Sequence, residues 1–154
     1  TKYLLTDFAS PELPPALPRL TYDLVGKGYR LICAHPERMF RMEDVLRLRE
    51  TGFYIQLTAT ALLGDWGADA KRVSMECLER GLCHFIASDA HNRKRGFHMT
   101  RARAMVERHF GGEIAELLFE RNPELLLDGR LPERMPTRRL SFWERMRFRF
   151  DNQP

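Results

Sequence analysis

Residues 84–92 read His-Phe-Ile-Ala-Ser-Asp-Ala-His-Asn, a short apolar run that ends in polar side chains. The run predicts a buried β-strand over residues 84–88. Because alternate residues of an extended chain point to one face, Asp89 and His91 are expected to lie side by side where the strand ends. A carboxylate and an imidazole so placed can bind a divalent metal ion. They equally fit a helix-capping Asp and a solvent-facing His, so the neighbouring sequence must decide.

Strand-like and helix-like segments alternate outward from this stretch. Four successive strand–helix units predict parallel strands with helical crossovers, an α/β fold of one-domain size. After the third strand, a loop containing Gly64 and Gly67 is expected. The predicted strands are residues 3–8, 29–34, 53–57 and 84–88, and the predicted helices are residues 17–27, 42–50, 68–80, 100–110 and 113–120.

Three of the four predicted strands end in or are followed by a potential metal ligand. Asp7 lies at the carboxyl end of the first strand, His35 follows the second, and the pair of Asp89 and His91 follows the fourth. In parallel α/β folds, functional side chains gather in the loops beyond the carboxyl ends of the strands. Helix capping alone does not explain the repeated placement, so the sequence favours a metal site.

Two arginines accompany these residues. Arg38 belongs to residues 34–38 (AHPER), and Arg95 belongs to the cationic run 93–95 (RKR) beside His91. A planar guanidinium can hold two phosphoryl oxygens at once. Each arginine alone could equally be a solvated surface residue. Beside a metal site, however, the two predict a phosphate ester as the substrate.

Other hydrolase mechanisms lack their motifs. A cysteine phosphatase needs five residues between its thiolate and its arginine, whereas four separate Cys33 from Arg38 and Pro36 removes a backbone amide. The sequence contains no P-loop, no GxGxxG fingerprint and no GxSxG elbow after a predicted strand. The remaining histidines are interpreted as structural: His84, His98 and His109.

Cysteine usage and charge indicate the compartment and the partners. Cys33, Cys77 and Cys83 have apolar neighbours and no CxxC spacing, which predicts reduced thiols and a cytoplasmic protein. The net charge of +4 gives no support for nucleic-acid binding and suits a protein that handles phosphate. The chain starts at Thr1 and enters a strand at once, so we expect it to be a piece of a longer protein.

Several segments together resemble a known family, the PHP-type (polymerase and histidinol phosphatase) protein-tyrosine phosphatases of bacterial capsule and exopolysaccharide operons. The resemblance is to the C-terminal part of these proteins and covers about residues 1–128. The segments that carry it are residues 4–8 (LLTDF), 28–38 (GYRLICAHPER) and 84–92 (HFIASDAHN), extended by residues 97–99 (FHM) and 122–123 (NP).

The resemblance implies a distorted (β/α)7 PHP barrel with a cluster of about three metal ions at its carboxyl-end mouth. Divalent manganese is expected there, with iron or zinc as alternatives. Hydroxide activated by the metals would attack the phosphorus of phosphotyrosine. The family's metal ligands fall on Asp7, His35, Asp89 and His91, and its phosphate-holding arginines fall on Arg38 and, with a one-residue gap, on Arg95.

The chain departs from the family pattern in two ways. The family has Glu where this chain has the shorter Asp7. Its opening strand, with a His-x-His motif and further ligands, would precede residue 1. We therefore expect the N-terminal strands to be missing, the metal cluster to be incomplete and the activity of this chain to be low. The exposed sheet edge left behind invites pairing with another copy, a homo-oligomer.

Residues 132–154 differ in character from residues 1–131, the barrel portion. Arginines and aromatic residues alternate in this basic-aromatic tail, and a helix would place Leu140, Trp143 and Phe150 on one face. We expect these side chains to pack on the barrel. The alternative is contact with an anionic membrane surface or with an acidic partner such as a membrane-associated tyrosine kinase.

The leading hypothesis is therefore a metal-dependent phosphotyrosine-protein phosphatase, present here as a fragment. One alternative is a PHP phosphoesterase for a small phosphate ester such as histidinol phosphate. The other is a non-catalytic PHP remnant that acts as an interaction module.

Overall fold

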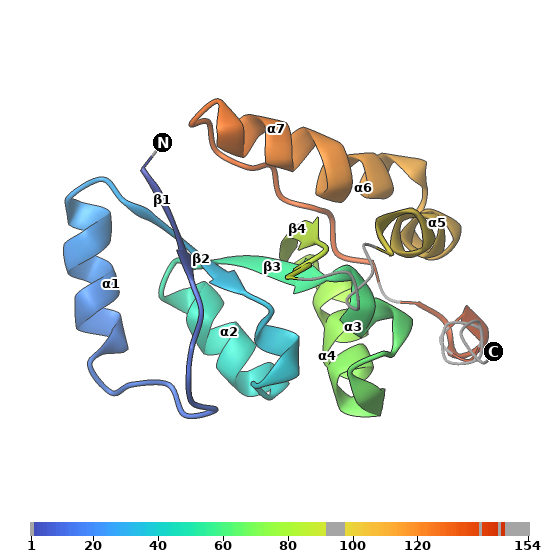
Figure 1. Ribbon diagram of the computed structural model, residues 1–154, viewed down its shortest axis with the longest axis horizontal. Coiled ribbons are helices and arrows are strands. Elements are labelled where there is room, and N and C mark those ends of the chain that lie inside the picture. The colour runs from blue at the N-terminus through green and yellow to red at the C-terminus, as the bar shows by residue number, and fades with distance from the viewer. Residues whose placement is uncertain (1, 92–97, 139, 145, 147–154) are drawn as a thin grey trace.

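A computed structural model describes the chain except for residues 1, 92–97, 139, 145 and 147–154. Its sheet has four parallel strands in the order in which they occur along the chain (Figure 1). The predicted α/β class with parallel strands is confirmed. The strands are β1 (Tyr3–Thr6), β2 (Arg30–Ala34), β3 (Tyr54–Thr58) and β4 (Cys83–Ala87).

Helical crossovers join the strands, as a parallel sheet requires. Helix α1 lies beside β2, whereas α5 to α7 gather beside β4 (Figure 1). The described helical segments are α1 (Leu17–Gly26), η1 (Pro36–Arg38), α2 (Met42–Glu50), α3 (Ala59–Leu63), α4 (Gly67–Glu79), α5 (Met99–Phe110), α6 (Gly112–Glu116), the π-helical turn η2 (Leu117–Arg121) and α7 (Asn122–Leu127).

The prediction of a loop directly after the third strand is wrong, because the chain forms helix α3 there. The residues of α3 read Ala-Thr-Ala-Leu-Leu, and all five are buried. Alanine and leucine are strong helix formers. Gly64 ends the helix with a φ of 96°, a left-handed conformation that suits glycine at this position.

The core lies between the sheet and its covering helices. Ile55 and Leu57 of β3 are fully buried, and Val45 and Leu48 of α2 belong to the same cluster. The three cysteines are buried and free, which agrees with the prediction of reduced thiols. Within the described residues, no helix is both long enough and apolar enough to cross a membrane.

His84 is a structural residue, as predicted. Its side chain is fully enclosed, packs edge-on against Tyr54, and through Nδ1 accepts a hydrogen bond of 3.3 Å from the Ile55 amide. That amide lies at an irregularity in the pairing of β3 with β4. Burial, with the positive charge of Arg49, lowers the pKa of His84 to about 3. The imidazole therefore stays neutral in the folded protein.

The low pKa of His84 predicts that acid weakens the fold. Between pH 6.5 and about 3, His84 is protonated in the unfolded chain but stays neutral in the folded chain. The free energy of unfolding should therefore fall with decreasing pH, by at most about 1.4 kcal/mol per pH unit from this group. Urea unfolding of the wild type and of His84→Asn, at several pH values, measures the effect. The stability gap between the two proteins should narrow in acid; a pH-independent gap would contradict the assignment.

The basic-aromatic tail differs from the expectation in part. Leu140 is buried in the core, as expected, but Trp143 is 74% exposed and pairs edge-to-face with Phe142 instead of packing on the sheet. A capping box precedes the helical residues 142–144, because the Ser141 hydroxyl and the Glu144 carboxylate each accept a hydrogen bond from the other's amide. Both aromatic side chains are exposed. Phe150 lies outside the described residues.

Strand β1 forms one edge of the sheet and carries the exposed side chain of Leu5. An edge strand of this kind can pair with another chain. The expected pairing with a second copy stays a prediction.

Candidate metal and phosphate site

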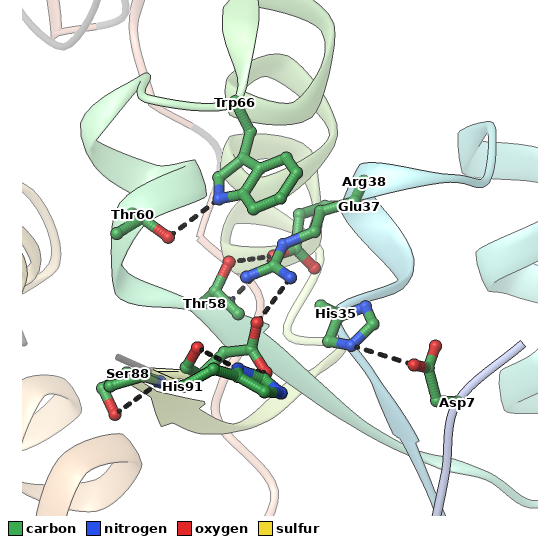
Figure 2. A network of polar contacts seen from close by, with 11 residues as sticks. Asp7, His35, Glu37, Arg38, Thr58, Thr60, Trp66, Ser88 and His91 are labelled. Atoms are coloured by element: carbon green, nitrogen blue, oxygen red, sulfur yellow. Dashed lines mark hydrogen bonds and ion pairs between the residues drawn. The ribbon is translucent and has the colours of Figure 1, made fainter. Parts of the chain in front are cut away.

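The carboxyl ends of the four parallel strands meet at one edge of the sheet, where Asp7, His35, Arg38 and His91 lie (Figure 2), together with Asp89, the partner of Arg38. Asp7 follows β1, His35 follows β2, and Asp89 follows β4 after Ser88. The sheet itself thus brings together residues that are far apart in the sequence.

The four predicted ligands form two pairs in this structure. His35 Nε2 lies 3.7 Å from an Asp7 carboxylate oxygen, and His91 Nδ1 lies 3.7 Å from an Asp89 carboxylate oxygen. Among the described residues, no group of three or more His, Cys, Asp or Glu is arranged to hold a metal ion. The structure therefore juxtaposes the predicted ligands without closing them into one cluster.

Two of these residues have an unusual backbone conformation. His35 has a φ of 37° and Asp89 a φ of 48°, both in the left-handed region. Asp and His tolerate this region better than most residues, yet it still costs energy and is frequent at active sites. In both places the strand ends abruptly, so that the side chain is presented at the sheet edge.

Arg38 is held at the centre of the site by Asp89. Its Nη1 donates to Asp89 Oδ2 at 2.5 Å, and the two side chains are only 10% and 13% exposed. Removing one partner from such a shielded ion pair leaves an uncompensated charge. The Nε–H of Arg38 is buried without a hydrogen-bond partner in the described part of the chain. The guanidinium thus retains an unused donor.

Glu37 is a site residue that the sequence did not reveal. Its fully buried carboxylate accepts hydrogen bonds from the amide (2.9 Å) and the hydroxyl (2.7 Å) of Thr58. Burial raises its pKa to about 7, although the hydrogen bonds from Thr58 act in the opposite direction. The contacts fasten the turn that carries Arg38 to the end of β3. A Glu in a polar motif gives no sequence signal of burial.

The sequence also did not reveal Trp66 and Thr60 as site residues. The indole ring covers the guanidinium of Arg38, and its Nε1–H donates to the Thr60 hydroxyl at 3.0 Å (Figure 2). Both residues follow β3, where a glycine-containing loop was expected. Without α3, nothing in the sequence aims Trp66 at Arg38.

Two other predictions concern this region. Burial raises the pKa of the Cys33 thiol to about 12, so the group stays protonated and does not serve as a nucleophile. The rejection of a cysteine-phosphatase mechanism is therefore supported. Arg95, the second predicted phosphate-binding residue, lies outside the described residues.

The chemistry of the donor set fits a divalent metal. The residues at the sheet edge provide two carboxylates and two imidazoles, which are ligands for manganese, iron or zinc. The neighbouring Arg38 provides positive charge and N–H donors for an oxyanion. The site can thus combine metal binding with the recognition of a phosphate group.

Comparison with known proteins agrees with this picture. Residues 1–128 match the family model described as "Capsular polysaccharide synthesis, CpsB/CapC". The chain is 40% identical over 141 residues to tyrosine-protein phosphatase YwqE of Bacillus subtilis, covering 88% of this chain and 55% of that protein. It is 33% identical over 135 residues to the putative tyrosine-protein phosphatase CapC of Staphylococcus aureus, covering 85% and 51%.

A solved structure is also similar. It comes from the crystal structures of YwqE from Bacillus subtilis and CpsB from Streptococcus pneumoniae, described as metal-dependent tyrosine phosphatases. The TM-score is 0.81 at 38% identity, covering 92% of this chain and 59% of the solved chain. This chain thus spans between half and three-fifths of the length of these relatives. The family expected from the motifs is confirmed: the chain belongs to the CpsB/CapC family of capsular polysaccharide synthesis.

Proposed function

We propose that this chain provides the phosphate-binding arginine and part of the metal-binding site of a metal-dependent phosphotyrosine-protein phosphatase. The observation that carries the proposal is the shielded pair of Arg38 and Asp89 at the carboxyl edge of the sheet, flanked by His35 and His91. The similar proteins named as tyrosine phosphatases support it.

Each residue has a separate task in this proposal. Four residues would hold divalent metal ions: Asp7, His35, Asp89 and His91. The ions would supply Lewis-acid activation of water and would stabilise charge on the phosphoryl group. Arg38 binds two phosphoryl oxygens and orients the phosphorus for in-line attack. Arg95 is proposed as a second phosphate-binding residue.

Glu37 holds the turn that carries Arg38 against the end of β3 through its hydrogen bonds to Thr58. Because this carboxylate contacts the backbone of β3, the turn and the strand end form one unit. The proposed catalytic edge is therefore built on the sheet itself and not on a loop alone, which favours the precise positioning that phosphoryl transfer needs.

The finer architecture is part of the proposal. The four-stranded sheet would be the C-terminal part of a distorted (β/α)7 PHP barrel, whose N-terminal strands bring further metal ligands beside β1. Residues 1–131 would form this part of the barrel and residues 132–154 a separate tail. The family match, which covers residues 1–128, supports this division.

Metal, substrate and compartment follow from the same chemistry. Manganese is proposed as the metal, with iron and zinc as alternatives, because carboxylate and imidazole ligands suit all of them. The proposed substrate is a phosphotyrosine protein, such as a membrane-associated tyrosine kinase of capsule or exopolysaccharide synthesis. The buried free thiols suit a cytoplasmic location. We propose no nucleic-acid partner. For this chain by itself we propose a homo-oligomer formed through the edge of β1, which the N-terminal strands would cover in the complete barrel.

A phosphatase assay on two proteins tests the proposal. One is this chain; the other is a chimera in which it replaces the matching segment of Bacillus subtilis YwqE. We expect the chimera to hydrolyse a phosphotyrosine peptide with Mn²⁺ and to lose that activity in EDTA. The chain alone should be far less active, since fewer ligands are present in it.

The same assay separates the alternatives. Faster hydrolysis of histidinol phosphate than of the phosphotyrosine peptide would indicate a phosphoesterase for small substrates. A chimera that folds, binds Mn²⁺ and hydrolyses neither substrate would indicate a non-catalytic interaction module. Either result would overturn the proposed function.

A further inference from the structure

Trp66 lies directly against the proposed phosphate-binding arginine. The Cζ atom of Arg38 is 4.0 Å from the centroid of the indole ring (Figure 2). A guanidinium at this distance over an aromatic face is attracted by the ring's quadrupole. The hydrogen bond from the indole Nε1–H to Thr60 fixes the ring in its plane. At 41% exposure, Trp66 is not a core residue, so burial does not account for its placement.

Among the described residues, the guanidinium also binds the Asp89 carboxylate. Asp89 is also a proposed metal ligand, and a divalent ion is the largest charge in any site that it occupies. A carboxylate shared with such an ion attracts the arginine less strongly. In contrast, a neutral indole ring does not bind the metal, so the metal does not weaken its contact with the guanidinium.

We propose that Trp66 is a positioning residue that holds the plane of the Arg38 guanidinium in the orientation that receives a phosphoryl group. A contact through the ring leaves the N–H groups of the guanidinium pointing sideways, the arrangement in which arginine binds oxygen atoms. In this structure Nη1 donates to Asp89, and Nε–H has no partner in the described part of the chain. The inference rests on the proposed function, because it assigns Arg38 to the phosphate. Trp66 acts through Arg38 and need not touch the substrate.

The test compares Trp66→Leu, which removes the aromatic face, with Trp66→Phe, which keeps one. The first readout is the Nε–H proton resonance of Arg38 in this chain, identified by its disappearance in Arg38→Lys. An indole ring beneath the guanidinium shifts it upfield. The second readout is the affinity for inorganic phosphate, measured by calorimetry with Mn²⁺ present. Thermal unfolding of each variant checks the fold.

We expect Trp66→Leu to abolish the upfield shift and to weaken phosphate binding about five- to thirtyfold, the range for a partly desolvated cation–π contact. Trp66→Phe should stay within about twofold of the wild type. In the chimera, Trp66→Leu should raise KM more than it lowers kcat. If Trp66→Leu does not fold, Thr60→Val, which removes the acceptor of the indole N–H, should weaken phosphate binding in the same direction.

Two results would overturn the inference: an Arg38 resonance that is not shifted in the wild type, or unchanged phosphate affinity in a folded Trp66→Leu variant. A wild-type chain that binds no phosphate would count instead against the proposed function. In that case the Arg38 resonance alone decides whether Trp66 positions the guanidinium. The two failures are therefore distinguishable.

Discussion

Replacing His91 by alanine is expected to lower the Mn²⁺-dependent hydrolysis of a phosphotyrosine peptide by about two to three orders of magnitude in the chimera. Loss of a metal ligand removes several kcal/mol of transition-state stabilisation, and about 1.4 kcal/mol corresponds to a tenfold change in rate. The His91 side chain is 65% exposed, so the free energy of unfolding should change by less than about 0.5 kcal/mol. Steady-state kinetics and thermal unfolding of the metal-free protein measure the two quantities.

His98→Asn is the matched control for this prediction. His98 precedes α5 with a φ of 39°, and asparagine tolerates that left-handed conformation. We interpret His98 as structural, so this variant should keep the rate of the parent protein. A His91→Ala variant that keeps its rate would remove His91 from the site. A His98→Asn variant that loses as much would contradict the structural role of His98.

Replacing Asn122 by alanine is expected to lower the free energy of unfolding by about 2–4 kcal/mol. Its fully buried amide donates to the backbone oxygens of His84 and Glu133, at 2.9 and 3.0 Å, and accepts from the Glu133 amide at 2.7 Å. The side chain thus joins α7 to β4 and to the segment after α7. Alanine would remove these partners from the buried carbonyl of His84 and from the part-buried backbone groups of Glu133. Urea unfolding at neutral pH measures the loss.

Arg121→Ala, on the preceding residue, is the control. Arg121 makes exposed ion pairs with Glu116 and Glu133, at 3.1 and 3.3 Å. Exposed pairs of this kind contribute about 0–1 kcal/mol, so this variant should remain close to the wild type. If both variants lost similar stability, the hydrogen bonds of the buried Asn122 amide would not make the large contribution to stability that we expect.

Much of the fold could be predicted because the strands carry local signals. Residues 30–34 and 83–87 are short, mainly apolar runs that lie between a glycine two residues before and a polar residue directly after, and both form strands. Helix α3 was missed because its apolar residues continue those of β3 without a break. The spacing of hydrophobic residues cannot by itself distinguish a buried strand from a buried helix in so short a run. The exposed Trp143 was missed because an apolar helical face does not reveal whether a partner covers it.

The candidate site was predicted in outline for a topological reason. Parallel strands place all their carboxyl ends at one edge, so the residues that follow the strands had to meet there. The sequence could not show that Asp89 pairs with Arg38, or that Glu37 is buried against Thr58. Those contacts depend on side-chain directions in three dimensions, and the stacking of Trp66 depends on the unpredicted α3.

The central claim is that residues at the carboxyl edge of this sheet bind a divalent metal. Titration of Mn²⁺ into this chain, followed by the paramagnetic resonance signal of the free ion, tests the claim most directly. We predict that the wild type removes the free-ion signal in a saturable way and that a variant with both His35→Ala and His91→Ala does not. Equal binding by the two proteins, or no binding by the wild type, would contradict the account.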